Sequence, residues 1–77
     1  MKVKDLIEKL QAVDPELMVV RGGYEGGVTE VGSVDVQEVA LNANEEWYYG
    51  EHETLYADEK ANMQYVGKER ALVVHIT

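Results

Sequence analysis

The sequence contains no cysteine, which excludes a disulfide framework, a thiolate-bound metal site and a cysteine nucleophile. It also has no phenylalanine and a single tryptophan, so few large rings are available to fill a core. Its 77 residues are near the size at which one hydrophobic core is barely sufficient for stability. We therefore expect a single small domain that spans residues 1–77.

Basic residues are scarce, with 7 Lys and Arg against 15 Asp and Glu, and the net charge is −8. Residues 10–59 contain twelve acids and one base, Arg21. So acidic a stretch repels phosphate groups and argues against direct binding of nucleic acid or of an acidic membrane. Two interpretations remain, a solvated face or a surface for a basic partner such as a nucleic-acid-binding protein.

Long hydrophobic runs are also absent. No stretch has the length of a membrane-spanning segment or the pattern of a signal-peptide core. The expected location is the cytoplasm, without membrane contact.

The N-terminal segment has the apolar spacing of an amphipathic helix. One face would bury a single stripe of side chains against a sheet, and Asp14-Pro15 would end the helix, because a residue before proline avoids the α region. The stripe consists of Val3, Leu6, Ile7, Leu10 and Val13.

Three further segments have strand character. Residues 17–21 begin with a short apolar run that predicts a strand that is buried on both faces or lies centrally in the sheet. Residues 71–76 are apolar enough to predict a central strand. Within residues 33–42 the apolar phase changes near Gln37-Glu38, which indicates a bulge. The expected fold is α+β in the order α-β-β-β, a helix packed on a mainly antiparallel sheet of about three strands. A long loop, residues 43–66, precedes the last strand.

One helix cannot cover both faces of such a sheet. The opposite face needs a cover, either the long loop or a second copy of the protein. We therefore predict a homodimer.

Four of the six residues in Gly22–Gly27 are glycine. The loop lacks the lysine of a phosphate-binding loop and precedes a strand-like segment rather than a helix, so it predicts a hairpin loop with glycines at positive φ. Tyr24 and Glu25 lie at its tip and are candidate contact residues.

Residues 42–53 are the most unusual part of the chain. Trp47, Tyr48 and Tyr49 are adjacent, and charged residues flank them on both sides. The segment follows neither helical nor strand periodicity and is typical of a displayed contact surface. The alternative is that Trp47 fills the open face of the sheet. The full set of candidate binding residues is Tyr24, Glu25, Trp47, Tyr48, Tyr49, Glu51, His52 and Glu53.

Evidence for catalysis or a bound metal is weak. Glu51, His52 and Glu53 are adjacent and would point to opposite sides of a strand, and His75 is the only other histidine. Ser33 is the only serine, and no base accompanies it in the sequence. We expect neither a cofactor nor a metal, and no enzymatic activity.

The segments together resemble a group of small uncharacterised bacterial and phage or prophage proteins. The opening helix with Asp14-Pro15-Glu16 is unspecific, whereas the segments Gly23-Tyr24-Glu25-Gly26-Gly27 and Trp47-Tyr48-Tyr49-Gly50 are more specific. The likeness covers residues 1–53 and the closing strand. It implies an accessory protein of a mobile element and no particular mechanism.

The sequence thus predicts a non-enzymatic interaction module whose 22–27 and 42–53 loops lie near each other and contact a partner. That partner would be a basic host protein or a second copy of the chain. The alternative is a small-ligand or divalent-metal protein that uses the same loops.

Overall fold

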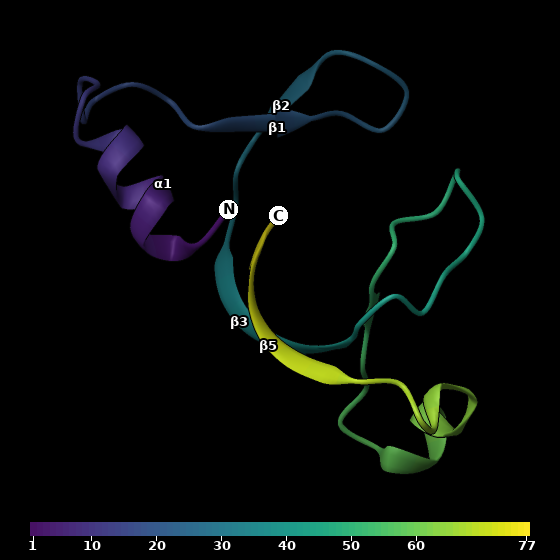
Figure 1. The fold of residues 1–77 in the computed structure, drawn as a ribbon. Coiled ribbons are helices and arrows are strands. Elements are labelled where there is room, and N and C mark those ends of the chain that lie inside the picture. The colour runs from purple at the N-terminus through teal and green to yellow at the C-terminus, as the bar shows by residue number, and fades with distance from the viewer. The chain divides into compact units, whose positions relative to one another are not determined.

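A computed structural model describes residues 1–77 and confirms the α+β class (Figure 1). It contains helix α1 (Val3–Leu10), strands β1 (Val20–Gly22), β2 (Val28–Glu30), β3 (Val34–Ala40), β4 (Glu53–Thr54) and β5 (Arg70–Ile76), and a 3₁₀ helix, η1 (Glu59–Tyr65). Neither helix has the length and hydropathy needed to cross a membrane.

The chain divides into two compact units, each described by itself below. The first, the N-terminal unit, comprises Met1–Val34 and Ile76–Thr77, and the second, the C-terminal unit, comprises Asp35–His75. The prediction of one domain over residues 1–77 stays a prediction.

Helix α1 has the predicted amphipathic character but a shorter span. The Asp5 carboxylate accepts a hydrogen bond from the Lys2 backbone N–H at 3.0 Å, which satisfies a donor at the helix start. The predicted burial of the apolar stripe was wrong, because Ile7 and Leu10 are 50% and 47% exposed and no residue of α1 is buried. Within its unit, the helix has only the ribbon of β1 and β2 as a neighbouring sheet, and three-residue strands offer little surface.

Strands β1 and β2 form an antiparallel hairpin around the glycine-rich loop, with Arg21 opposite Thr29. Gly26 and Gly27 have φ of 127° and 64°, so the prediction of positive φ is confirmed. The prediction of a buried strand from Leu17 was wrong. The strand begins at Val20, and residues 17–20 are exposed, since a two-stranded ribbon has no second layer to cover them.

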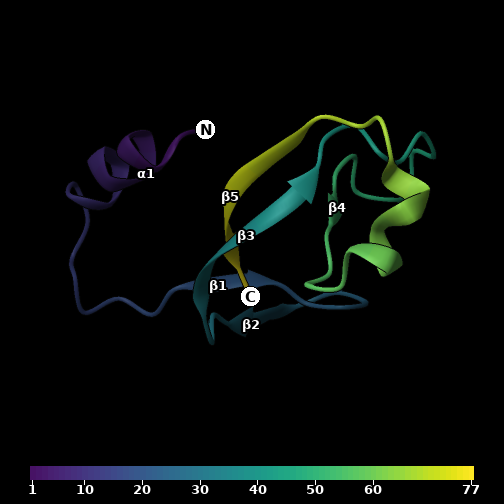
Figure 2. The ribbon, with the colours of Figure 1, turned by 90° about the horizontal axis from the view of Figure 1, so that it is seen from below.

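The C-terminal unit is built on a sheet in the order β4-β3-β5 (Figure 2). Two backbone contacts fix β5 antiparallel to β3. In the C-terminal unit Leu41 N–H donates to the Glu69 carbonyl at 2.7 Å, and in the N-terminal unit, where both strands have their other ends, Thr77 N–H donates to the Ser33 carbonyl at 3.0 Å. Both pairs have the same register, so neither strand has an extra residue between these two contacts. The bulge predicted near Gln37-Glu38 is therefore absent. Strand β5, predicted to be central, lies at the edge.

Burial along β3 depends on position along the strand rather than on the face. Alternate residues face opposite sides of a strand, so Val39 lies on one face, and Ala40 lies on the other with Val34 and Val36. Val39 and Ala40 are the buried apolar residues, with exposures of 6% and 0%, whereas Val34 and Val36 remain exposed. The core is therefore centred where β3 meets β4.

Candidate functional site

The 42–53 segment connects β3 to β4, and its two ends are held together by asparagines. Asn42 has a φ of 51°, a left-handed conformation that asparagine tolerates well. Asn44 donates from its side-chain amide to the Gly50 carbonyl at 2.9 Å and to Glu53 Oε2 at 3.0 Å. Its backbone N–H donates to the Glu51 carbonyl at 3.1 Å. We call residues 42–53 the aromatic loop.

His52 belongs to the base of the aromatic loop. Its Nδ1 accepts a hydrogen bond from the Asn42 backbone N–H at 2.9 Å, which requires an unprotonated Nδ1. Its Nε2 lies 3.6 Å from Glu51 Oε1. Glu53 pairs with Ala40 in the β3–β4 ladder, and its carboxylate accepts a hydrogen bond from Asn44, so His52 and Glu53 hold the loop in shape.

The three rings occupy the tip of the aromatic loop, where Tyr49 N–H donates to the Glu46 carbonyl at 3.1 Å. Trp47 and Tyr48 meet edge to face with ring centroids 5.6 Å apart, and Tyr48 and Tyr49 lie 5.0 Å apart. Trp47 is 91% exposed, and both tyrosines are 62% exposed. Trp47 does not fill the sheet face, and the predicted exposure of at least two rings is confirmed.

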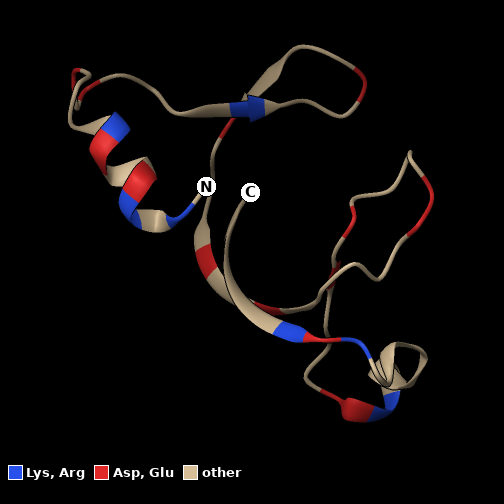
Figure 3. Cartoon of the chain, in the orientation of Figure 1, with Lys and Arg blue, Asp and Glu red and all other residues tan.

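Carboxylates surround this aromatic cluster without any basic residue in the loop (Figure 3). Glu45, Glu46 and Glu51 are exposed, while Glu53 is half-buried at the loop base. A cation that approaches the rings would meet both their negative faces and nearby negative charge.

Tyr24 and Glu25 belong to the other unit and lie at the tip of the β1–β2 hairpin. Tyr24 is 99% exposed, and Glu25 is exposed beside it. Gly23 N–H donates to the Gly27 carbonyl at 3.0 Å and closes the tip. The predicted proximity of this tip to the aromatic loop stays a prediction.

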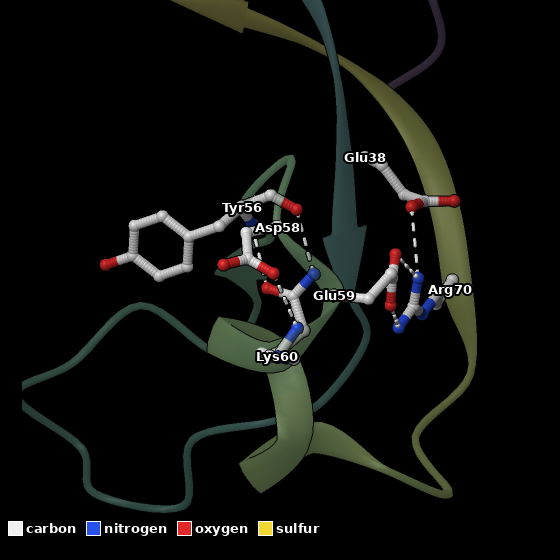
Figure 4. A network of polar contacts seen from close by, with 7 residues as sticks. Glu38, Tyr56, Asp58, Glu59, Lys60 and Arg70 are labelled. Carbon is white, nitrogen blue, oxygen red and sulfur yellow. Dashed lines mark hydrogen bonds and ion pairs between the residues drawn. The ribbon is translucent and has the colours of Figure 1, made fainter.

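Two polar contacts that sequence analysis missed stabilise the C-terminal unit (Figure 4). The buried Asn62 side chain accepts from Tyr56 N–H and donates to the Tyr56 carbonyl, both at 2.8 Å. Arg70 forms two hydrogen bonds to Glu59, at 2.9 and 3.0 Å, and approaches Glu38 at 3.4 Å. These partners are distant in sequence or separated by a loop, so no local pattern indicates them.

The Arg70–Glu59 pair makes stability depend on pH. Hydrogen bonds from Arg70 lower the pKa of the Glu59 carboxyl below its ordinary value of 4.5. A lowered pKa in the folded state stabilises the fold above the unfolded value, and the stabilisation is lost as pH falls through the folded value. The difference in Tm between wild type and Glu59→Gln should therefore be constant near neutral pH and shrink below pH 4.5.

Thermal melts between pH 7 and pH 3 measure this difference, with Glu45→Gln as the control because Glu45 takes part in none of the ion pairs. Because both partners are at the surface, we expect a small effect. A difference for Glu59→Gln that does not change with pH would contradict the assignment.

The small-ligand and metal alternatives stay predictions. No group of three or more His, Cys, Asp or Glu side chains is arranged to hold a metal ion. An apolar hollow of about 490 Å³ lies in the N-terminal unit, and its lining residues belong to neither candidate loop. They are Leu10, Val13, Asp14, Pro15, Leu17, Met18, Val19 and Val20.

No protein-family model matches this sequence, and no curated protein or solved structure is significantly similar to it.

Proposed function

We propose that the protein is a non-enzymatic interaction module that binds a partner protein through the tip of the aromatic loop. The observation that carries the proposal is a 91% exposed tryptophan at the tip of a loop whose two ends are joined by hydrogen bonds. Exposed tryptophan and tyrosine rings bury large areas on binding and lose little conformational entropy. Holding the loop in shape before binding further lowers the entropic cost of association.

The charge around the rings supports a basic partner. The aromatic loop carries four carboxylates and no basic residue, in a chain of net charge −8. Lysine or arginine side chains on the partner would stack on Trp47 or a tyrosine and pair with Glu45 or Glu46. The same charge disfavours nucleic acid and acidic membranes as direct ligands.

The hairpin tip is a second contact in this proposal. Tyr24 is the most exposed of the aromatic residues, and Glu25 gives its loop the same combination of ring and carboxylate. Each tip would bind the partner through its own residues.

The surroundings of Ser33 support a role other than catalysis. The only serine, Ser33, shares a hydrogen bond of 2.6 Å with the Thr77 hydroxyl rather than with a histidine. The residues that suggest the phage or prophage group support a role as a cytoplasmic accessory protein of a bacterium or its phage.

Affinity capture from a bacterial lysate tests the proposal. We expect immobilised wild-type protein to retain a basic protein that a variant with Trp47, Tyr48 and Tyr49 all changed to alanine does not retain. Retention should fall as salt rises from about 50 to 500 mM, because screening weakens charge attraction between exposed groups. Equal capture by both forms, or capture of acidic proteins alone, would exclude the aromatic loop as a site for a basic partner.

A further inference from the structure

Strand β5 has an open edge of unpaired backbone groups. The sheet order is β4-β3-β5, so β5 has a neighbour on one side only. Ser33 and Thr77 exchange two hydrogen bonds, Ser33 N–H to the Thr77 carbonyl at 2.9 Å and Thr77 N–H to the Ser33 carbonyl at 3.0 Å. Hydrogen-bonded pairs alternate along an antiparallel ladder, so odd-numbered residues of β5 face β3. The N–H and C=O groups of Arg70, Leu72, Val74 and Ile76 therefore point outward.

This edge lacks the features that usually prevent strands from pairing between molecules. Natural edge strands are short, or contain proline, bulges or inward-pointing charges. Strand β5 is seven residues long, Arg70–Ile76, has no proline, and carries its one permanent charge at the first residue. Arg70 is in addition engaged by Glu59.

Charge also favours β5 as a contact between two copies, because it lies in the least acidic segment of the chain. Residues 60–77 contain three bases and one acid, whereas residues 1–59 contain four bases and fourteen acids. Two chains of net charge −8 that meet at β5 therefore meet through a segment that itself carries a small positive net charge.

We infer that a second copy of this chain pairs with β5 antiparallel about a two-fold axis at Val73. This register uses all seven residues of each strand. It places Leu72 of one copy opposite Val74 of the other as a hydrogen-bonded pair, which uses the outward-pointing backbone groups. Val73 then faces its own counterpart in a non-hydrogen-bonded pair. Such a symmetric contact is isologous and closed, so it ends at a dimer.

The pairing joins two three-stranded sheets into one six-stranded sheet. It brings the exposed side chains of Leu72 and Val74 against the same residues of the other copy, and cross-strand apolar pairs of this kind stabilise sheets. The proposal is independent of the aromatic loop and of its partner.

The absence of native cysteine allows a direct test of the axis. In a non-hydrogen-bonded antiparallel pair the Cα atoms are about 4.5 Å apart, within the range that a disulfide spans. Val73→Cys is therefore expected to give a covalent dimer in high yield under mild oxidation. Ala71→Cys is the matched control, because its counterpart lies roughly 14 Å away along the strands and cannot be bridged.

Sedimentation equilibrium separates edge pairing from stacking of the apolar sheet faces. Wild type should be a dimer at micromolar concentration. Leu72→Lys should weaken dimerisation at least tenfold, whereas Val36→Lys, on the same face of β3 but away from the edge, should leave it unchanged. Circular dichroism checks that each variant is folded.

Three results would overturn the inference. They are a monomeric wild type, a covalent dimer of Ala71→Cys that forms as readily as that of Val73→Cys, and loss of the dimer on Val36→Lys but not on Leu72→Lys.

Discussion

Trp47→Ala is expected to weaken binding of the captured partner by ~1–4 kcal/mol, or about 5- to 1,000-fold in Kd, while leaving the free energy of unfolding within about 0.5 kcal/mol of wild type. The ring is 91% exposed in the free protein, so its removal creates no cavity. It would, however, take away the largest apolar area that the aromatic loop offers to a partner.

Isothermal titration with the purified partner measures the loss, and Tyr56→Ala is the matched control. Tyr56 is also exposed in the C-terminal unit, and its ring points away from the polar contacts around Asn62 and Arg70 (Figure 4). Trp47 fluorescence gives an independent measurement because Trp47 is the only tryptophan. We expect red-shifted emission that iodide quenches readily. Blue-shifted, quencher-resistant emission and a loss of about 3–5 kcal/mol of stability in Trp47→Ala would instead show a buried ring.

Asn62→Ala is expected to lower the free energy of unfolding by about 1–3 kcal/mol, because it leaves two partly buried backbone groups of Tyr56 without partners. Asn62 is 1% exposed and is the largest fully buried side chain of the protein. Val39 and Ala40 are the only buried apolar residues, so the rest of the core contributes little free energy of unfolding to offset this loss.

Chemical denaturation measures this loss, and Met63→Ala is the control because Met63 is the next residue of η1 and is exposed. Amide exchange at Tyr56 should also become faster in Asn62→Ala, since its N–H loses its acceptor. Equal stability of Asn62→Ala and wild type would show that water replaces the side chain at no cost.

The candidate site could be located from sequence because its signal is local. Adjacent aromatics among acids fit no buried element, and the structure displays Trp47, Tyr48 and Tyr49 at a loop tip. The roles of individual polar residues were less predictable. The sequence predicts His52 as a contact residue, whereas its Nδ1 accepts a hydrogen bond from the Asn42 backbone N–H, ten residues earlier, and holds the loop base. Asn42 offers one local signal, since it comes two residues after β3 and asparagine tolerates the left-handed conformation found there.

The burial of each strand was the property that the sequence predicted least well. The apolar segment Leu17–Val20 predicted a buried strand and residues 71–76 predicted a central one, but the first is exposed and only its last residue belongs to β1, and the second is an edge strand. The hydrophobicity of a segment indicates that its burial would stabilise the fold. Which segment obtains a neighbour depends on pairing between residues far apart in the chain, and β3 took the central place by pairing with both β4 and β5.

The sequence by itself determined the α+β class, the amphipathic α1, the glycine hairpin and the acidic, aromatic character of the loop. These follow from periodicity, φ preferences and composition, which act over a few residues. Only the tertiary structure decided the edge position of β5, the pairing of Arg70 with Glu59 and the burial of Asn62. These depend on contacts that close long loops, and short-range patterns carry no information about which distant groups will meet.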